Sequence, residues 1–177
     1  MNTPNKLTLL RVFLIPVYVV LMLVVFKNHY YYAGAVFIIA SLTDLVDGYI
    51  ARKNNLVTDF GKFADPLADK LLVMSAMVIF VQMNMIKSYI VIIILAREFA
   101  VTALRTMAAK NGVVMAADKI GKWKTTVQMI ALVLMHFFEL SPNLYTAANV
   151  LIYVAAVLTI VSGVNYFVLN KDCISMD

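Results

Sequence analysis

Cysteine is nearly absent from this chain, which holds one copy, Cys173. A single cysteine cannot close an internal disulfide, so a disulfide-stapled fold is excluded. Histidine is almost as scarce, and its two copies, His29 and His136, stand too far apart in the sequence to form a metal-binding motif. Charged residues make up only 14% of the chain, against about a quarter in soluble domains.

Apolar residues take the place of the missing charges. They make up 63% of the 177 residues, and apolar runs of about 20 residues recur, the length that crosses a bilayer core. We therefore expect a polytopic membrane protein in which residues 1–177 form a single domain within the lipid bilayer. The formal charge of +5 then reflects Lys and Arg beside the spans, which set topology, and does not indicate binding to nucleic acid.

The apolar runs predict an all-α fold, a bundle of six transmembrane helices with an N-terminal interfacial helix. The first span lies within residues 1–26, and the others lie at residues 32–52, 60–83, 89–107, 123–140 and 147–169. Asn5, Thr8 and Arg11 recur at three-residue steps, which predicts a polar face on a short interfacial helix leading into the first span. A signal peptide is the alternative, but no small-x-small cleavage site follows the apolar run.

An even number of spans places both termini on the same side of the membrane. Most of the 15 Lys and Arg residues fall on that side: Arg97 lies mid-span, and only Lys27 and Lys87 fall on the other side. Because cytoplasmic loops are enriched in basic residues, we expect the termini and the turn after residue 52 to face the cytoplasm at the cell membrane.

Four regularly spaced aspartates, among only ten acidic residues in the chain, lie in one short stretch, at Asp44, Asp47, Asp65 and Asp69. The first two lie three apart and the last two lie four apart, so each pair shares one face of a helix. The polar residues 53–59 predict a turn between two antiparallel helices, whose acidic faces can then oppose each other. Four converging carboxylates repel one another unless cations compensate them. All-oxygen ligands favour Mg²⁺ or Mn²⁺, and two ions can share such a set.

Small residues accompany the aspartates. Gly48, Ala51 and Gly61 each lie one helical turn from an aspartate. Without bulky side chains, these positions let a ligand approach the acidic faces closely. Arg52 ends the first of the two helices at the expected membrane surface, where its guanidinium can bind a phosphate.

The residues from Asp44 to Asp69 follow the pattern D-x2-D-G-x2-A-R-x8-G-x3-D-x3-D without a departure. This pattern resembles the signature of the CDP-alcohol phosphatidyltransferase family. The resemblance implies six transmembrane helices, a homodimer, two Mg²⁺ or Mn²⁺ ions held by the four aspartates, and Asp69 as the general base. The activity it implies is transfer of the phosphatidyl group of CDP-diacylglycerol to an acceptor hydroxyl, with CMP leaving.

The resemblance also implies a set of residues that bind CDP-diacylglycerol. They are Asn5, Thr8, Gly48, Ala51, Arg52, Thr58 and Gly61. Alternatives remain from the residues alone, since Asn5 and Thr58 can each cap a helix. Arg11 can likewise extend its side chain to the membrane surface.

Basic residues in the second half of the chain suit a phosphorylated acceptor. The stretches N-K-L-T-L-L-R at 5–11, A-R-E at 96–98 and K-x-G-K-x-K-T at 119–125 resemble the phosphatidylglycerophosphate synthase branch of the family, which implies glycerol 3-phosphate as acceptor. Its phosphate is expected to bind Arg97, Arg105, Lys119 and Lys122. Alternatively, Arg97 and Glu98 form a structural pair, and the two lysines anchor the chain at the membrane interface.

Other functions stay open at this point. A sister phosphatidyltransferase would use inositol phosphate, serine or phosphatidylglycerol, although serine carries no phosphate for the basic residues to bind. A divalent-cation transporter would also place aspartates in the membrane, but here they cluster at the cytoplasmic end without an acidic path to the other side. A structural membrane subunit would leave the four facing aspartates unexplained.

Overall fold

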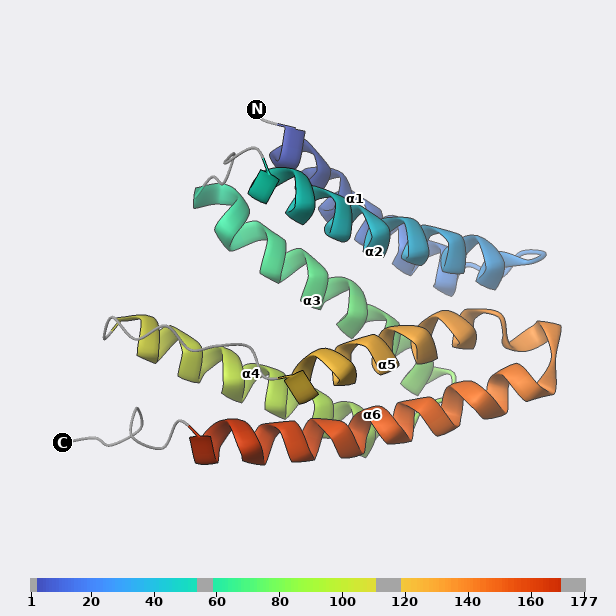
Figure 1. Cartoon of the computed structure of the whole chain (residues 1–177). Coiled ribbons are helices and arrows are strands. Elements are labelled where there is room, and N and C mark those ends of the chain that lie inside the picture. The colour runs from blue at the N-terminus through green and yellow to red at the C-terminus, as the bar shows by residue number, and fades with distance from the viewer. Residues whose placement is uncertain (1–2, 54–58, 111–118, 170–177) are drawn as a thin grey trace.

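The computed structural model describes the backbone of residues 3–53, 59–110 and 119–169 (Figure 1). Side chains are described for the same residues except 3–7, 44–53, 59–66, 69 and 110. Within these ranges the chain forms six α-helices and one short 3₁₀ helix, and no strand, which confirms the all-α prediction. They are α1 (Thr3–Leu23), α2 (His29–Lys53), α3 (Asp59–Gln82), α4 (Ser88–Lys110), α5 (Lys119–His136), η1 (Phe138–Leu140) and α6 (Pro142–Leu169).

Asparagine marks two of the turns between helices. Asn28 and Asn84 have φ angles of 64° and 59°, in the left-handed region that asparagine tolerates better than most residues. After α3, the amide of Met85 donates to the carbonyl of Phe80, and the amide of Asn84 donates to the carbonyl of Val81, both at 2.9 Å. This pair of bonds satisfies the last carbonyls of α3 and reverses the chain into α4.

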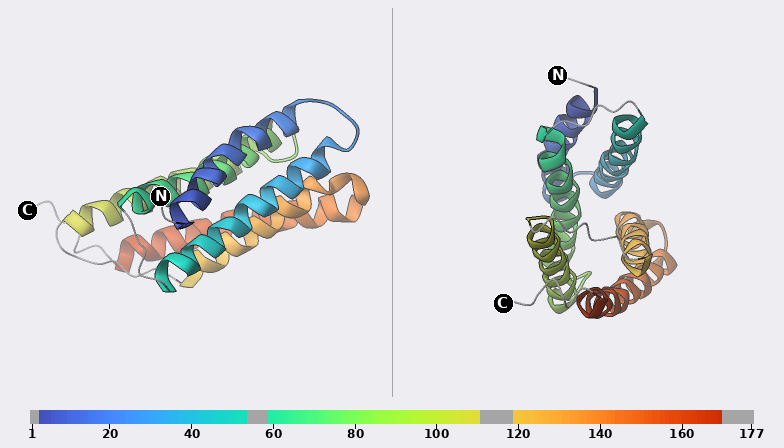
Figure 2. Two further views of the ribbon diagram at one scale, coloured as in Figure 1. Left: turned by 90° about the horizontal axis from the view of Figure 1, so that it is seen from above. Right: turned by 60° about the vertical axis from the view of Figure 1, so that its left-hand side comes forward.

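The six helices form a ring. Its order is α1, α3, α4, α6, α5 and α2, and α2 packs against α1 to close it, as the right-hand view of Figure 2 shows. The main buried core takes side chains from every helix, among them Tyr18, Phe37, Leu72, Ile94, Leu132 and Ile152. The ring brings α2, α3, α4 and α5 around one interior, although these helices are not all neighbours in the sequence.

Helix direction alternates along the chain, so the helix ends collect in two groups. The turn from α1 to α2 and the turn from α5 to α6 lie toward the right of Figure 1. Toward the left lie the end of α2, the start of α3 and the ends of α4 and α6. The aspartate-bearing parts of α2 and α3 therefore share one end of the bundle.

The N-terminal region differs from the expectation of a short interfacial helix leading into a span. Residues Thr3–Leu23 form one continuous α-helix, because no strong helix breaker separates the polar stretch from the apolar run and Pro16 is accommodated within the helix. Thr8 and Arg11 are 1% and 0% exposed, so the polar face turns into the bundle. Arg11 therefore does not extend to the membrane surface.

The other helices overlap the predicted spans but differ at their ends. The start of α5 lies at Lys119, four residues before the predicted 123–140 span, and the helix ends at His136. The start of α6 is Pro142, five residues before the predicted one, because proline suits the first position of a helix. Ser141 caps this start, since its Oγ accepts from the amide of Asn143 at 3.2 Å.

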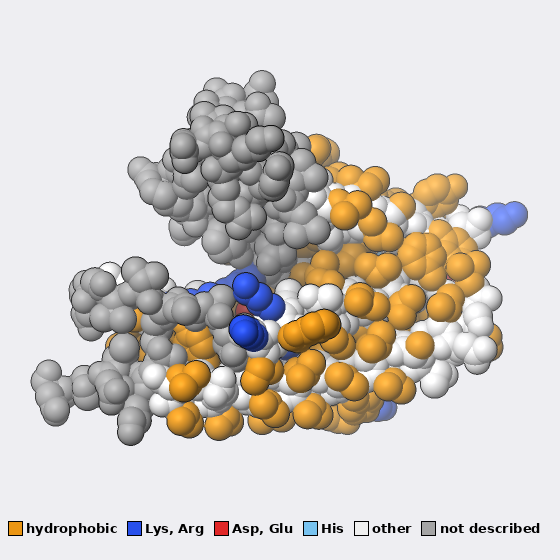
Figure 3. All heavy atoms as spheres, viewed as in Figure 1, with side chains coloured by type: hydrophobic (Ala, Val, Ile, Leu, Met, Phe, Trp, Pro, Cys, Tyr) orange, Lys and Arg blue, Asp and Glu red, His pale blue; other side chains and the backbone are white. Residues whose placement is uncertain are grey.

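One described helix, α6, is long and apolar enough to cross a membrane. Shorter apolar stretches lie at Thr8–Leu23 and Lys70–Gln82. Large apolar side chains are exposed on all six helices, among them Phe13, Ile39, Leu71, Ile92, Ile130 and Val164. Hydrophobic side chains cover most of the described surface in Figure 3, while a group of Lys and Arg side chains gathers toward the left. Soluble monomers rarely expose so much apolar surface, and a lipid bilayer would cover it.

Candidate active site

The sequence-predicted acidic site spans the C-terminal part of α2 and the N-terminal part of α3. Asp44 and Asp47 lie in α2, and Asp65 and Asp69 lie in α3. These assignments confirm the two predicted helices, and both parts lie at the same end of the bundle (Figure 1), while the predicted turn falls on residues 54–58, outside the described residues. The side chains of the four aspartates lie outside the described ones.

The predicted CDP-diacylglycerol-binding residues are mostly beyond the described side chains. Only the backbone is described for Asn5 in α1, for Gly48, Ala51 and Arg52 in α2, and for Gly61 in α3, and Thr58 lies outside the described residues altogether. Thr8 is the exception, since it is buried on the inner face of α1. The helix α1 packs against both α2 and α3, so this inner face adjoins the two acidic helices.

The donor chemistry of the acidic stretch fits a divalent cation. Carboxylate oxygens from two helices that share one end of the bundle are hard ligands, which suit Mg²⁺ or Mn²⁺ better than softer metals. Among the side chains that the structure describes, no three His, Cys, Asp or Glu residues are placed to hold a metal ion. The four aspartates are the candidate ligands that the sequence predicts.

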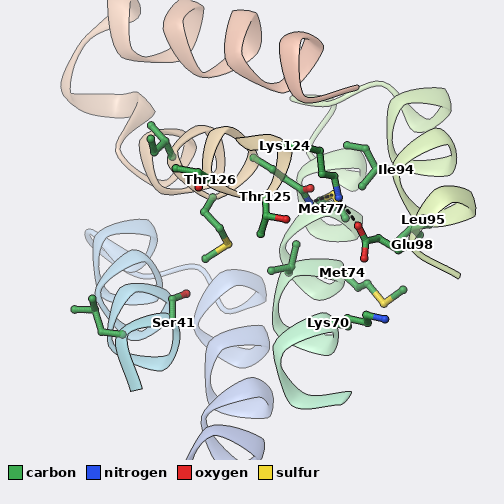
Figure 4. Close-up of a pocket in the computed structure, with 15 residues that line it drawn as sticks. Ser41, Lys70, Met74, Met77, Ile94, Leu95, Glu98, Lys124, Thr125 and Thr126 are labelled. Atoms are coloured by element: carbon green, nitrogen blue, oxygen red, sulfur yellow. Dashed lines mark hydrogen bonds and ion pairs between the residues drawn. The ribbon is translucent and has the colours of Figure 1, made fainter. Parts of the chain in front are cut away.

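A cavity of about 410 Å³ lies inside the ring beside the acidic stretch. Its polar lining comes from α2, α3, α4 and α5, namely Ser41, Lys70, Glu98, Lys124, Thr125, Thr126 and Gln128. Figure 4 shows these helices around the cavity, with Ser41 on α2 across from Glu98 on α4. Ser41 precedes Asp44 by three residues and Lys70 follows Asp69 directly, so the cavity adjoins the acidic site.

An ion pair between buried Lys124 and partly buried Glu98 forms one wall of the cavity. The Lys124 ammonium donates to Glu98 Oε1 at 2.6 Å, and the whole Lys124 residue is 2% exposed. Arg97 Nη1 lies 3.3 Å from the same oxygen. A buried charge without a partner costs several kcal/mol, so the Glu98 carboxylate is what allows Lys124 to face the interior.

Arg97 extends away from the cavity and toward α6. Its Nη2 donates to Ser162 Oγ at 2.6 Å. Two glycines make room for it: an added Cβ would lie 3.1 Å from Arg97 Nη2 at Gly121 and 3.2 Å from Arg97 Cγ at Gly163. Ser162, Arg97, Glu98 and Lys124 thus form a continuous series of contacts from α6 through α4 to α5. We call these four residues the cavity cluster.

The other predicted acceptor-phosphate residues lie apart from the cavity wall. Arg105 Nε donates to the Tyr166 hydroxyl at 2.8 Å, and its guanidinium carbon lies 5.3 Å from the centroid of that ring. Lys119 and Lys122 are exposed in the first turn of α5. The structure therefore brings Arg97 near the cavity wall but does not place these four residues in one pocket.

The sequence analysis did not single out Lys124, although this lysine belongs to the K-x-G-K-x-K-T stretch at 119–125. The buried face of α5 carries Lys124, Gln128, Ala131, Leu132, Met135 and His136. Lys124 therefore shares the three-to-four-residue spacing of the buried face, whereas Lys122 falls on the opposite side of the helix. This helical phase was the signal that could have identified Lys124.

Comparison with known proteins finds one matching family and several individual proteins of similar sequence. Residues 1–161 match the CDP-alcohol phosphatidyltransferase family. A Bacillus subtilis protein named CDP-diacylglycerol–glycerol-3-phosphate 3-phosphatidyltransferase is 46% identical over 187 aligned positions, which cover 98% of this chain and 97% of that protein. A Rickettsia typhi protein of the same name is 39% identical over 94% of this chain and 95% of its own length. A third, from Haemophilus influenzae, is 38% identical over 96% of this chain and 94% of its own length.

Proposed function

The chain belongs to the CDP-alcohol phosphatidyltransferase family, and we propose that it transfers the phosphatidyl group of CDP-diacylglycerol to glycerol 3-phosphate. The products are phosphatidylglycerol phosphate and CMP. The observation that carries this proposal is the similarity to proteins named for this reaction over almost the whole length of both chains. The cavity beside the acidic helices supports it, because its wall carries the ammonium groups of Lys70 and Lys124, which suit a phosphorylated acceptor.

The reaction needs one bond to form and one to break at phosphorus. The acceptor hydroxyl oxygen bonds to the phosphorus next to the lipid, the bond from that phosphorus to the CMP oxygen breaks, and CMP leaves. Asp69 takes the hydroxyl proton as general base. Asp44, Asp47, Asp65 and Asp69 would hold two Mg²⁺ or Mn²⁺ ions. When bound, such ions neutralise charge on the diphosphate and in the transition state.

CDP-diacylglycerol binds next to the aspartates in this proposal. Its binding residues are Asn5, Thr8, Gly48, Ala51, Arg52, Thr58 and Gly61. The buried position of Thr8 on α1 supports this assignment, since α1 packs against both acidic helices. Gly48, Ala51 and Gly61 leave room for the nucleotide, and Arg52 binds its phosphates.

The acceptor phosphate is drawn to the basic residues Arg97, Arg105, Lys119 and Lys122. Lys119 and Lys122 are exposed and can reach an anion directly. Arg97 donates to Ser162, and Arg105 donates to Tyr166. These two arginines therefore attract the acceptor phosphate through the positive electrostatic potential they create near the site, more than through direct contact.

The proposed setting is the cell membrane. The helices cross the bilayer six times as a single domain, the active site and both termini face the cytoplasm, and two copies form a homodimer. The exposed apolar side chains on all six helices support burial in lipid. The basic residues on the side of the acidic site support the cytoplasmic orientation.

The test is CMP release from CDP-diacylglycerol by the purified chain with Mg²⁺ or Mn²⁺. Glycerol 3-phosphate, inositol phosphate, serine and phosphatidylglycerol are supplied in turn, and Asp69→Asn is the control. Release with glycerol 3-phosphate alone, lost in Asp69→Asn, is the expected result. Release with another acceptor would replace glycerol 3-phosphate in the proposal. No release by folded protein would overturn it, and metal flux into proteoliposomes would then point to transport.

A further inference from the structure

Arg11 belongs to the polar face of α1, yet the proposed function gives it no role. Arg11 is 0% exposed, so its guanidinium lies inside the bundle. It is not one of the described residues that line the cavity. A fully buried guanidinium has a charge and five N–H donors to satisfy within the protein. Its role is therefore to hold another side chain and not to contact a substrate.

The register between α1 and α2 indicates which side chain Arg11 holds. The two helices run antiparallel and pack against each other (Figure 1). The rings of Tyr18 on α1 and Phe37 on α2, both 0% exposed, have centroids 5.7 Å apart. Seven residues make about two turns and return to nearly the same helix face. Arg11 stands seven residues before Tyr18, and Asp44 stands seven residues after Phe37. The same register therefore places position 44 opposite Arg11.

The buried face of α2 supports this register. Ala33, Phe37 and Ala40 are each 0% exposed and follow one another at spacings of four and three residues. The next position in the series, four residues further along α2, is Asp44. The inward face of α2 thus changes from apolar to acidic where the inward face of α1 changes from Tyr18 to Arg11.

The carboxylates around α1 belong almost entirely to the acidic site. Besides α2, α1 packs against α3. Apart from Asp59, the first residue of α3, every acidic residue of these two helices is one of the four aspartates. Lys70, the cation next to Asp69, donates to Thr102 Oγ1 on α4 at 2.5 Å, so it turns away from α1. A buried guanidinium needs opposite charge nearby, and the packing of α1 offers the acidic site as its source.

We infer that Arg11 is the positioning residue of Asp44: its guanidinium donates to one side of the carboxylate and leaves the other side for a divalent cation. This inference rests on the metal site of the proposed function. A carboxylate has two oxygens with about four lone-pair sites, so it can accept from a guanidinium and bind a metal ion together. Without Arg11, repulsion from the neighbouring aspartates would turn Asp44 away from the orientation that binds metal.

The experiment measures the Kd for Mn²⁺ by calorimetric titration of the purified protein in detergent, without substrate. Arg11→Met removes the charge and every N–H donor but keeps an unbranched side chain. Loss of a group that orients a metal ligand predicts a Kd about 10–100-fold higher than in wild type. Arg11→Lys keeps the charge without the planar fork and should recover part of the affinity. If Arg11→Met is not recovered as folded protein, Arg11→Lys carries the test with a smaller increase in Kd.

A double-mutant cycle tests whether Arg11 acts through Asp44. In an Asp44→Asn background, Arg11→Met should change the Kd for Mn²⁺ by no more than about twofold, because the carboxylate it orients is gone. In EDTA, the double variant should melt at a higher temperature than Asp44→Asn alone, which leaves a buried charge without its counter-charge. Tyr18→Phe is the matched control on the same buried face of α1, and it should leave the Kd unchanged.

Kinetics of CMP release give a second measurement. The Mn²⁺ concentration for half-maximal rate should rise in Arg11→Met by a factor similar to that of the Kd. At saturating Mn²⁺, the KM values for CDP-diacylglycerol and for glycerol 3-phosphate should both stay unchanged, because Arg11 lies behind Asp44 and touches neither substrate. A purely structural Arg11 would lower the melting temperature without changing the Mn²⁺ dependence.

The outcomes separate this inference from the function on which it rests. A Kd in Arg11→Met that matches or falls below the wild-type value would overturn the inference alone. Equal increases in Kd in the wild-type and Asp44→Asn backgrounds would overturn it as well. Wild type that releases CMP but binds no Mn²⁺ directly would overturn the inference and leave the transfer reaction standing. Wild type that neither binds Mn²⁺ nor releases CMP would overturn both.

Discussion

Two clusters of buried and partly buried polar side chains in this bundle differ in how completely their hydrogen-bonding groups are paired. Tyr18 and His136, which we call the core cluster, are both 0% exposed. The Tyr18 hydroxyl donates to His136 Nε2 at 2.9 Å, and His136 Nδ1 donates to the carbonyl of Leu132 at 2.7 Å. The rings of Phe37 and Phe80 lie 5.1 and 4.9 Å from the imidazole. A neutral imidazole with its proton on Nδ1 satisfies every polar atom of this cluster.

The cavity cluster is charged and leaves donors unused. Arg97 Nε is buried without a hydrogen-bond partner among the groups that the structure describes, and Lys124 has donors left beyond Glu98. Burying such groups costs free energy that a purely structural cluster would avoid. The difference shows that the saturated core cluster stabilises the contact of four helices, whereas the cavity cluster is suited to a ligand.

The largest expected effect tests whether catalysis depends on the end of the bundle that carries the four aspartates. Asp69→Asn removes the proposed proton acceptor, so CMP release should fall by about 10²–10⁴-fold, the range for a general base. Thermal unfolding in detergent should change little, because asparagine keeps the shape of the side chain. Activity and melting temperature are measured on the same preparation. A lowered melting temperature together with lost activity would show that Asp69 is needed for the fold.

The next effect tests the core cluster by crowding it. A Cβ added at Gly34 would lie 2.8 Å from His136 Cβ, which is tied to its own backbone and cannot easily move. Overpacking of this kind costs about 1–3 kcal/mol, and the gain in helix propensity of about 0.5–1 kcal/mol offsets only part of it. Gly34→Ala should therefore lower the free energy of unfolding, measured by denaturation in detergent. Both KM values of the folded fraction should stay unchanged, and a raised KM for glycerol 3-phosphate would contradict the separation of the two clusters.

A smaller effect follows from removing one hydrogen bond of the core cluster. Tyr18→Phe keeps the ring but leaves His136 Nε2 without its donor. The free energy of unfolding should fall by about 0.5–1.5 kcal/mol, the usual net contribution of one hydrogen bond. Tyr32→Phe is the matched control, since Tyr32 is exposed and lies outside this cluster. Equal stability of the two variants would show that the Tyr18 hydroxyl contributes nothing to the fold.

The smallest effect on stability comes from Gly121→Ala, the counterpart of Gly34→Ala in the cavity cluster. Its Cβ would meet Arg97 Nη2 at 3.1 Å, at the far end of a flexible side chain that can shift. The free energy of unfolding should change by less than about 0.5 kcal/mol, as at most sites without a rigid clash. The KM for glycerol 3-phosphate should nevertheless rise, because displaced Arg97 loosens Glu98 and Lys124. A large loss of stability with unchanged kinetics would reverse the assignments of the two clusters.

The helices and the acidic motif were predictable from the sequence because both depend on local spacing. Apolar runs of helical length gave the positions of the six described helices, with end errors of four or five residues at both ends of α5 and at the start of α6. Asp44 and Asp47 share a helix face by their spacing alone. The continuity of α1 was not predicted, because the polar stripe at Thr8 and Arg11 fits an interfacial helix as well as an inward-facing one.

The contacts of the two clusters could not be predicted in the same way. His136 meets Tyr18 across 118 residues, Arg97 meets Ser162 across 65 and Lys124 meets Glu98 across 26. Each of these pairs joins two different helices, so each depends on the order in which the helices pack around the ring.

By itself the sequence determined an all-α membrane protein with a phosphatidyltransferase motif at the junction of two helices, because helix periodicity and fixed spacing act within short segments. Only the tertiary structure decided which polar groups face inward together. The closed ring directs Lys124 and Glu98 into a shared cavity and turns Arg97 toward α6. The physical reason is that burial and pairing of charges depend on neighbours brought from elsewhere in the chain, which no local pattern encodes.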